Sequence, residues 1–409
     1  MPKRLSTQTK LILAILLAAL VIGGCAASDG LDNLVRRART EINNLLPKPD
    51  FVPTPLAAAS FLPTYTPTTI PSPATPIPET PPTPTPPPAH QPAGPSASLS
   101  GFTHMWQTWN NCGPATLAMN LSYFGSPLDQ ADVAAVMRPN PDDKNVSPHE
   151  MADFARAQGY LARTQVNGTS DLLRTLLANG LPVIVETWHE DDPNDGMGHY
   201  RLLTGFDDTA QRWTAFDSFD AKDLINPDGA YAGITVPYAN FDDLWQVFNR
   251  VAVIVYTPEQ TDLVASILGA DMDDSAMWTV SLAQAQTEAQ ANPADPFAWF
   301  NQGSSLLALG RPDEAAAAFD QSRRLGLPWR MLWYQFGPFE AYHATGRHAE
   351  IVALADATLR NVTDVEELHY WRGMALQALG DTDAARQAFQ KSVELNPHYQ
   401  PAIQALAIP

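Results

Sequence analysis

The residue of this chain best suited to covalent chemistry is Cys112, in the run QTWNNCGPA at residues 107–115. The chain has two cysteines, and the other, Cys25, lies in an N-terminal segment with a different role. A lone thiol outside the cytoplasm is explained either by burial in a core or by reactivity. Apolar residues at helical spacing follow as far as Phe124, and Gly125 ends the pattern. Cys112 therefore opens a predicted helix, where the thiolate is favoured, and we expect a nucleophile.

A cysteine nucleophile needs a base and a group that orients the base. His199 lies in the segment 198–206, which alternates like a half-buried strand, and a second predicted strand covers 212–216. Asp217 ends that second strand. Two adjacent antiparallel strands would place His199 and Asp217 side by side, with the carboxylate holding the imidazole tautomer. Gln107, five residues before Cys112, is the candidate donor to an oxyanion.

Three other histidines are weaker candidates. His189 is a rival base, but the neighbouring acids Glu190, Asp191 and Asp192 favour a solvated loop histidine. His104 and His149 have no strand context. The acidic loop 191–195 resembles a calcium loop in composition alone, and the sequence has no paired-cysteine or His-Glu-x-x-His metal motif. We therefore expect no metal and no cofactor.

The order and spacing of these motifs resemble the bacteriocin-processing, double-glycine-leader cysteine peptidase-like family, which belongs to the papain clan. The resemblance covers about residues 102–256 and includes the segments Gly198-His-Tyr and Thr204-Gly-Phe-Asp. It implies an α+β papain-like domain, with a helix bearing the cysteine and an antiparallel sheet. It also implies that Cys112 is the nucleophile, His199 the general base and acid, Asp217 the orienting group and Gln107 the oxyanion donor.

Two departures limit what this resemblance implies. Ser218 follows Asp217 where relatives often have proline. The founding members are attached to an exporter with an ATP-binding domain, and nothing similar is present in this sequence. Cleavage of leader peptides is therefore not carried over as the substrate assignment.

The N-terminus resembles a bacterial lipoprotein signal. Basic residues precede the apolar run 11–22, and Gly23-Gly24 precede Cys25. We expect cleavage after residue 24, acylation of Cys25 and a position on the outer face of the plasma membrane. An uncleaved signal anchor is the alternative, and it gives the same compartment because the positive flank stays inside.

Composition divides the remainder of the chain. Residues 25–46 form a juxtamembrane segment, and 47–97 are rich in Pro and Thr, which predicts a disordered stalk. In extended polyproline conformation such a stalk reaches on the order of 150 Å. The peptidase-like domain is expected at 98–258. Connecting helices are expected at 259–295, and an all-α region at 296–409.

The all-α region is repetitive. Gly310, Gly346 and Gly380 are spaced by 36 and 34 residues. The first unit has small and aromatic residues at positions that recur in the third, and this pattern resembles the tetratricopeptide repeat family over about 296–397. The pattern residues of the first unit are Trp299, Gly303, Leu306, Ala315 and Phe319, and those of the third are His369, Gly373, Leu376, Ala385, Phe389 and Pro397. The middle unit has Phe339 in place of the small glycine, so we expect irregular packing there. Repeats of this kind usually bind a protein partner; the alternative is that they extend the fold or self-associate.

Acidic residues outnumber basic ones, 44 to 25, which gives a formal charge of -19. This balance argues against nucleic acid as a partner, because phosphate backbones are bound by basic patches. The expected partners are a peptide or protein substrate, a protein on the repeats and the membrane through Cys25.

Three functions remain open at this point. The first is a surface-anchored cysteine peptidase or amide hydrolase whose repeats recruit a substrate or partner. The second is a catalytically inactive lipoprotein scaffold of the same fold. The third is a papain-fold acyltransferase or cell-wall amidase. The set Gln107, Cys112, His199 and Asp217 favours an enzyme over a scaffold.

Overall fold

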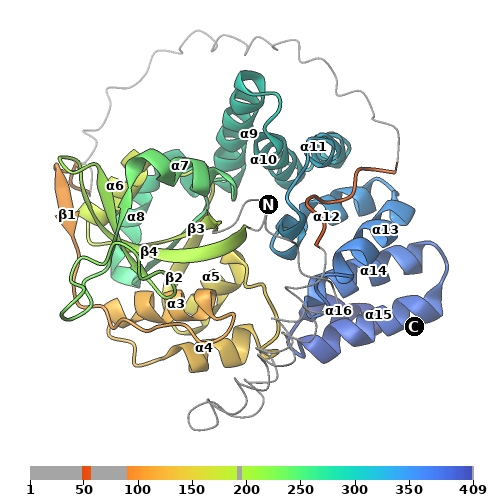
Figure 1. The fold of residues 1–409 in the computed structure, drawn as a ribbon, viewed down its shortest axis with the longest axis horizontal. Helices are drawn as coiled ribbons and strands as arrows, with labels where there is room; N and C mark the ends of the chain where they lie inside the picture. The colour runs from red at the N-terminus through yellow and green to blue at the C-terminus, as the bar shows by residue number, and fades with distance from the viewer. Residues whose placement is uncertain (1–47, 57–89, 191–195, 408–409) are drawn as a thin grey trace, which may run out of the picture. The chain divides into compact units, whose positions relative to one another are not determined.

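The computed structural model of this chain describes residues 48–56, 90–190 and 196–407 (Figure 1). The chain divides into two compact units, Met1–Asp50 and Phe51–Pro409. The predicted signal peptide, Cys25 and the juxtamembrane segment lie outside the described residues, and so does the acidic loop 191–195. Within the described ranges, no helix has the length and apolar character needed to span a bilayer.

A seven-stranded antiparallel sheet forms the centre of the peptidase-like region. Six strands follow the order β2-β7-β3-β4-β5-β6, and β1 pairs with β4. The strands are β1 Ser96–Ser98, β2 Leu161–Gln165, β3 Val183–His189, β4 Met197–Asp207, β5 Arg212–Asp217, β6 Ile234–Pro237 and β7 Ala252–Tyr256. The helices of this region are α3 Cys112–Tyr123, α4 Gln130–Met137, α5 Pro148–Ala157, α6 Ser170–Ala178, α7 Tyr238–Gln246, the 3₁₀ helix η1 Pro258–Gln260 and α8 Thr261–Leu268.

Helices cover both faces of this sheet (Figure 1). Successive side chains of a strand point to opposite faces, and β3 shows this alternation. Val183 and Val185 pack into an apolar cluster with α6, α7 and α8, whereas Ile184 packs into a second cluster with α3, α4 and α5. The sheet is therefore the middle layer of three, and α3, which begins at Cys112, lies against one of its faces.

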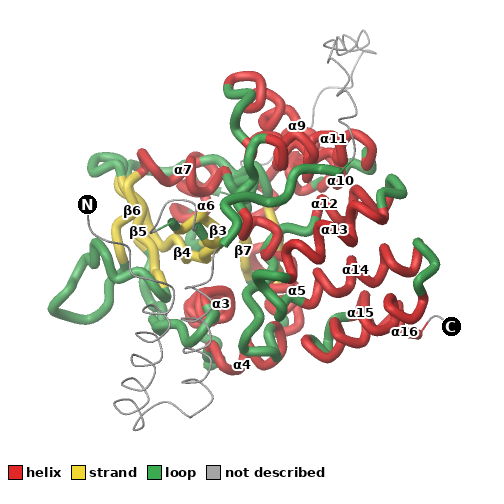
Figure 2. Tube along the Cα trace, turned by 45° about the vertical axis from the view of Figure 1, so that its right-hand side comes forward, coloured by secondary structure: helices red, strands yellow, loops and turns green. Residues whose placement is uncertain are grey.

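The C-terminal region is helical, as Figure 2 shows. Its elements are the 3₁₀ helix η2 Gly269–Met272, α9 Asp274–Ala291, α10 Pro296–Ala308, α11 Pro312–Arg324, η3 Trp329–Trp333, α12 Gly337–Ala344, α13 His348–Leu359, α14 Glu366–Ala378, α15 Thr382–Leu395 and α16 Gln400–Ala407. The three predicted inter-helix glycines each adopt a positive φ between paired helices. The irregularity expected of the middle unit is present, because α12 has 8 residues where α10 and α14 have 13.

Close approach explains the small residues of the repeats. A Cβ placed on Gly303 would lie 2.7 Å from the ring of Phe319, and one on Gly373 would lie 2.6 Å from the ring of Phe389. Both rings are almost fully buried. The glycine of one helix and the aromatic ring of the next thus form a tight pair in the first and third units, which is why these marks recur in register.

One hydrophobic core joins the peptidase-like region to the repeats. Trp188, Val247 and Phe248 belong to the same buried cluster as Phe300 and Leu306. The predicted connecting segment 259–295 divides between the two regions, since α8 packs against the sheet and α9 against α10. Deletion of the chain after Pro258 would therefore expose this core, and the repeats are an integral part of the fold.

The predicted stalk, 47–97, needs correction at both ends. The Val52 amide donates to the Leu327 carbonyl at 2.8 Å, and the Arg323 guanidinium donates to the carbonyl of Pro53 at 2.9 Å. At the other end, β1 forms inside the predicted stalk and pairs with β4. A proline-rich composition predicted one continuous stalk, but apolar Val52 and the alternating residues 96–98 find partners on the folded unit. Segment 57–89 lies outside the described residues.

Candidate active site

Cys112 is the first residue of α3, as the sequence predicts. The residue is partly buried, while the next nine residues of the helix are fully buried. The backbone N–H groups of Tyr200 and Gly113 lie within hydrogen-bonding reach of the sulfur. A helix N-terminus and two N–H donors therefore surround the atom that would become negative.

His199 lies beside Cys112 and is held by Asp217. Its Nε2 is 2.9 Å from Oδ1 of Asp217, and its ring is also within hydrogen-bonding reach of the Cys112 sulfur. Because Asp217 occupies Nε2, the nitrogen left for the sulfur is Nδ1. The predicted adjacency arises from the antiparallel pairing of β4 with β5, in which Arg201 is directly opposite Asp217. The structure thus brings Cys112, His199 and Asp217 together.

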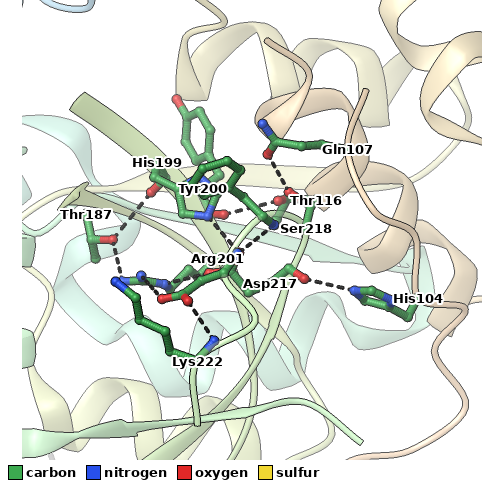
Figure 3. A network of polar contacts seen from close by, with 12 residues as sticks. His104, Gln107, Thr116, Thr187, His199, Tyr200, Arg201, Asp217, Ser218 and Lys222 are labelled. Carbon is green, nitrogen blue, oxygen red and sulfur yellow. Dashed lines mark hydrogen bonds and ion pairs between the residues drawn. The ribbon is translucent and has the colours of Figure 1, made fainter. Parts of the chain in front are cut away.

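Asp217 is the most heavily supported member of this group (Figure 3). Its Oδ2 accepts from Nε of Arg201 at 2.8 Å, and its Oδ1 accepts from the backbone N–H groups of Phe219 and Asp220 at 2.8 and 2.7 Å. The backbone carbonyl of Asp217 accepts from Nε2 of His104 at 2.8 Å. The carboxylate is fully buried and stays ionised because of these donors.

These contacts shift the proton equilibria of the site in a consistent direction. Burial of Cys112 opposes the thiolate, but the hydrogen bond and charge of His199 outweigh it, and the pKa of the thiol is lowered. Burial of His199 opposes the imidazolium, yet Asp217 and then Cys112 raise its pKa to about 9. The pKa of Asp217 is lowered, since the charges of His199 and Arg201 exceed the effect of burial. These contacts therefore stabilise the thiolate of Cys112 and the imidazolium of His199 together, relative to a free thiol and a free imidazole.

Gln107 lies next to this group and is oriented by Ser218. The Ser218 hydroxyl donates to Oε1 of Gln107 at 2.9 Å, and the backbone N–H of Gln107 donates to the backbone carbonyl of Ser218 at 2.8 Å (Figure 3). With Oε1 occupied, the amide nitrogen is the end of the side chain left to donate to a substrate. The serine that departs from the family pattern thus fixes the orientation of the glutamine.

The remaining histidines occupy different positions. His189 ends β3 and its ring centre is 6.0 Å from that of His199, so its prediction as a loop histidine is wrong. The neighbouring acids suggested a loop, but the strand pairing of β3 with β4 extends through His189. His104 stacks on Tyr231 with ring centres 3.4 Å apart, and His149 lies in the first turn of α5. In the part of the chain that the structure describes, no three His, Cys, Asp or Glu side chains form a set able to hold a metal ion.

Three residues at the site escaped prediction. The sequence could have indicated Arg201, because it follows His199 by two residues on one strand and therefore lies on the same face of the sheet. Glu186 is an acid within the apolar strand β3, which is also a usable signal, and it lines a small pocket with Cys112. Tyr334 lines the same pocket from the repeat region. Nothing local in the sequence connects Tyr334 with a cysteine so far away along the chain.

The fold and these contacts define a class, which is a cysteine peptidase-like domain followed by helical repeats. Comparison with known families gives the same result. Residues 93–253 match the Peptidase_C39 like family, and residues 297–324 and 366–399 each match the tetratricopeptide repeat. The chain therefore contains a Peptidase_C39-like domain and tetratricopeptide repeats, and the predicted fold class is confirmed. No match was found among curated proteins.

Several solved structures are similar to parts of the chain. A double glycine motif protease from an AMS/PCAT transporter, solved with the leader peptide, is 19% identical over 41% of this chain and 98% of its own, with a TM-score of 0.29. The peptidase domain of Streptococcus ComA is 18% identical over 39% and 99%, also at 0.29. MamA is 14% identical over 33% and 78%, at 0.30.

Proposed function

We propose that this chain is a surface-anchored cysteine peptidase or amide hydrolase. The observation that supports this proposal best is the continuous series of contacts from Cys112 through His199 to Asp217. Cys112 is the nucleophile, His199 the general acid and base, and Asp217 the residue that holds the imidazole. Gln107 is the donor to the oxyanion. The contacts described above support each of these proposed roles.

In the first half-reaction, the Cys112 thiolate attacks the carbonyl carbon of the scissile amide and forms a carbon-sulfur bond. The carbonyl electrons move to the oxygen, which accepts hydrogen bonds from the Gln107 amide and from backbone N–H groups at the start of α3. The intermediate then collapses and the carbon-nitrogen bond breaks. The His199 imidazolium gives its proton to the leaving nitrogen, which leaves a thioester on Cys112 and a free amine.

In the second half-reaction, His199 is neutral and accepts a proton from water. The water oxygen attacks the thioester carbon, and the carbon-sulfur bond breaks as the acid product forms. Cys112 is again a thiolate and His199 again an imidazolium. Throughout both steps, Asp217 keeps Nε2 engaged so that Nδ1 faces the reacting atoms.

The pH dependence of Cys112 alkylation tests this assignment. We expect iodoacetamide to label Cys112 with a midpoint well below the free-thiol pKa of roughly 8.5. In His199→Ala the midpoint should rise, because the hydrogen bond and charge that stabilise the thiolate are lost. Labelling is followed at the Cys112 peptide by mass spectrometry of the full chain. Above a pH of about 9, hydrolysis of a substrate should fall as His199 loses the proton that the leaving group needs.

His189→Ala is the matched control, since this ring is the other imidazole near the site. It should leave the labelling midpoint close to that of the native protein. A native midpoint near that of a free thiol, unchanged by His199→Ala, would contradict the catalytic assignment and favour the scaffold. A shifted midpoint with thioester transfer to amines in place of hydrolysis would favour the acyltransferase.

The compartment is a proposal that rests on the sequence alone. The apolar run 11–22 followed by Gly23, Gly24 and Cys25 supports cleavage before Cys25 and acylation of its thiol, on the outer face of the plasma membrane. The Cys25→Ala chain should remain unprocessed and should incorporate no labelled fatty acid. Normal maturation of that variant would refute the anchor.

We also propose that the repeats bind a protein partner or the substrate. Tetratricopeptide repeats commonly present a concave surface to other chains. Because the repeats share a core with the peptidase-like region, a substitution at an exposed repeat residue tests recruitment better than a deletion. Leu379, which is 54% exposed, is such a position. Leu379→Asp should weaken cleavage of a native target while cleavage of a short peptide is unchanged, and equal loss on both would refute recruitment.

A further inference from the structure

Tyr334 of the repeat region lies at the pocket of the proposed nucleophile. It directly follows η3, and it lines a small pocket together with Cys112 and residues of the peptidase-like region. Other residues that line this pocket include Gly113, Glu186, Gly198 and Tyr200. The repeats thus contribute one side of the space next to the sulfur.

Tyr334 is fixed in this position by packing on both sides. Its ring centre is 6.2 Å from that of Phe248, with the rings nearly perpendicular. The backbone N–H of Gly198 is within hydrogen-bonding reach of the phenol oxygen. A Cβ placed on Gly198 would lie 3.4 Å from Cδ1 of Tyr334 and 3.1 Å from Phe248, so the glycine next to His199 allows this approach. An aromatic ring held in this way forms a rigid wall.

Glu186 indicates that the pocket faces a ligand. Its side chain is 3% exposed, and among the described residues its Oε2 has no hydrogen-bond partner. A buried carboxyl oxygen without a partner is unfavourable in a folded protein, and such groups are usually explained by function. Burial, followed by the charge of Cys112, raises the pKa of Glu186 well above its usual range. The unpartnered Oε2 beside the nucleophile can hydrogen-bond a group that enters the pocket.

We propose that Tyr334 is a specificity-determining residue, whose ring closes the pocket beside Cys112 to large side chains. A residue of the repeat region thus limits the size of the group that reaches Cys112. This inference rests on the proposed function, because a residue can select substrates only if Cys112 acts on them. The Tyr334 ring also limits which reagents reach the Cys112 thiol. This effect can be measured by labelling, without any substrate being cleaved.

The test compares thiol reagents of different size at Cys112 in the full chain. Labelling rates with iodoacetamide and with the bulkier N-phenylmaleimide are measured by mass spectrometry of the Cys112 peptide, and each is divided by the rate with free glutathione. In the native protein we expect the bulky reagent to be slower by about tenfold after this correction, which corresponds to the usual cost of an overpacked contact. Tyr334→Ala should restore most of this loss, whereas Tyr334→Phe should not, since it keeps the ring.

Tyr370→Ala is the matched control, because this tyrosine lies on α14 of the same region and packs against Phe389 and Tyr399. The control should behave as the native protein does. Equal corrected rates for both reagents in the native protein would overturn the proposal. This outcome is measured on the native protein alone, so it does not depend on whether a variant folds. A gain in Tyr370→Ala equal to the gain in Tyr334→Ala would also overturn it, because it would indicate general loosening.

The proposed function and this inference fail in distinguishable ways. An ordinary thiol pH profile would remove the catalytic assignment, yet the ratio of bulky to small reagent would still report the wall. If peptides are cleaved, a series with Gly, Ser and Leu next to the scissile bond extends the test. Tyr334→Ala should raise kcat/KM for the Leu peptide relative to the Gly peptide by about tenfold. An unchanged ratio would refute Tyr334 as the determinant.

Discussion

Glu366 provides a prediction whose size follows from its surroundings. This residue opens α14 and is 2% exposed, and Asn396 donates to its Oε1 at 2.6 Å. Its Oε2 has no partner among the described residues. Burial, opposed by the Asn396 hydrogen bond and assisted by the charge of Glu150, raises the pKa of Glu366 to about 7 from an ordinary value of 4.5. We expect Glu366→Gln to remove a pH-dependent loss of stability.

The sign and the magnitude follow from proton linkage. At a pH below about 4.5 the carboxyl is protonated in both states, and its stabilising contribution is complete. Between a pH of about 4.5 and 7, the Glu366 carboxyl is ionised in the unfolded chain but still protonated in the folded protein, so the free energy of unfolding falls as the pH rises. Above about 7 the loss attributable to this one group reaches about 3 kcal/mol. Glutamine keeps the acceptor for Asn396 and cannot ionise, so the variant should gain about 3 kcal/mol relative to the native protein between these limits.

Urea unfolding followed by tryptophan fluorescence, extrapolated to water at each pH, measures this difference. Glu394→Gln is the matched control, because Glu394 is a surface residue of α15 with a 70% exposed side chain. Its curve should follow the native one to within about 0.5 kcal/mol. If the gap between Glu366→Gln and the native protein changes by less than about 1 kcal/mol from pH 5 to pH 8, the assignment of a buried neutral carboxyl is incorrect.

Two further predictions concern packing and charge. Arg201→Met should lower the free energy of unfolding at neutral pH by about 3 to 5 kcal/mol, because buried Asp217 would lose its arginine partner; a loss below about 1 kcal/mol in urea unfolding would contradict this. Gly303→Ala should cost about 1 to 3 kcal/mol, since its new methyl group would meet Phe319. Gly94→Ala is the control, because its new methyl group would lie 3.9 Å from the nearest atom, the carbonyl oxygen of Ser96; equal melting temperatures for the two variants would refute the packing argument.

The fold was predictable where local patterns determine it. The helix beginning at Cys112, the strand pair containing His199 and Asp217, and the glycines between repeat helices all follow from periodicity and turn residues. The common core of the two regions was not predictable in this way. The apolar character of Trp188 and Phe248 predicts that they are buried, but it does not predict their partners. Only the tertiary structure shows that they pack with Phe300.

The candidate site divides along the same line. Cys112, His199, Asp217 and Gln107 belong to short motifs, so their proximity was predictable, although their catalytic roles stay predictions. The contact of Gly198 with Tyr334 joins distant parts of the chain, and no periodic pattern in the sequence indicates it. The order of motifs in the chain indicates which side chains meet within one sheet, whereas it carries no information about a side chain that arrives from another layer.

The attachment of Val52 to the repeats changes the length of the proposed tether. A tether ends at the first residue that is held, so the segment between the membrane and the folded unit runs from Cys25 to about Phe51. Only residues 47–51 of this segment belong to the proline-rich region, so the polyproline reach estimated for 47–97 does not apply to it. Segment 57–89 returns to the unit at His90, which hydrogen-bonds Ser266 at 2.9 Å. Under the proposed acylation of Cys25, lengthening segment 57–89 would leave the distance between Cys112 and the membrane unchanged, while lengthening residues 26–50 would increase it.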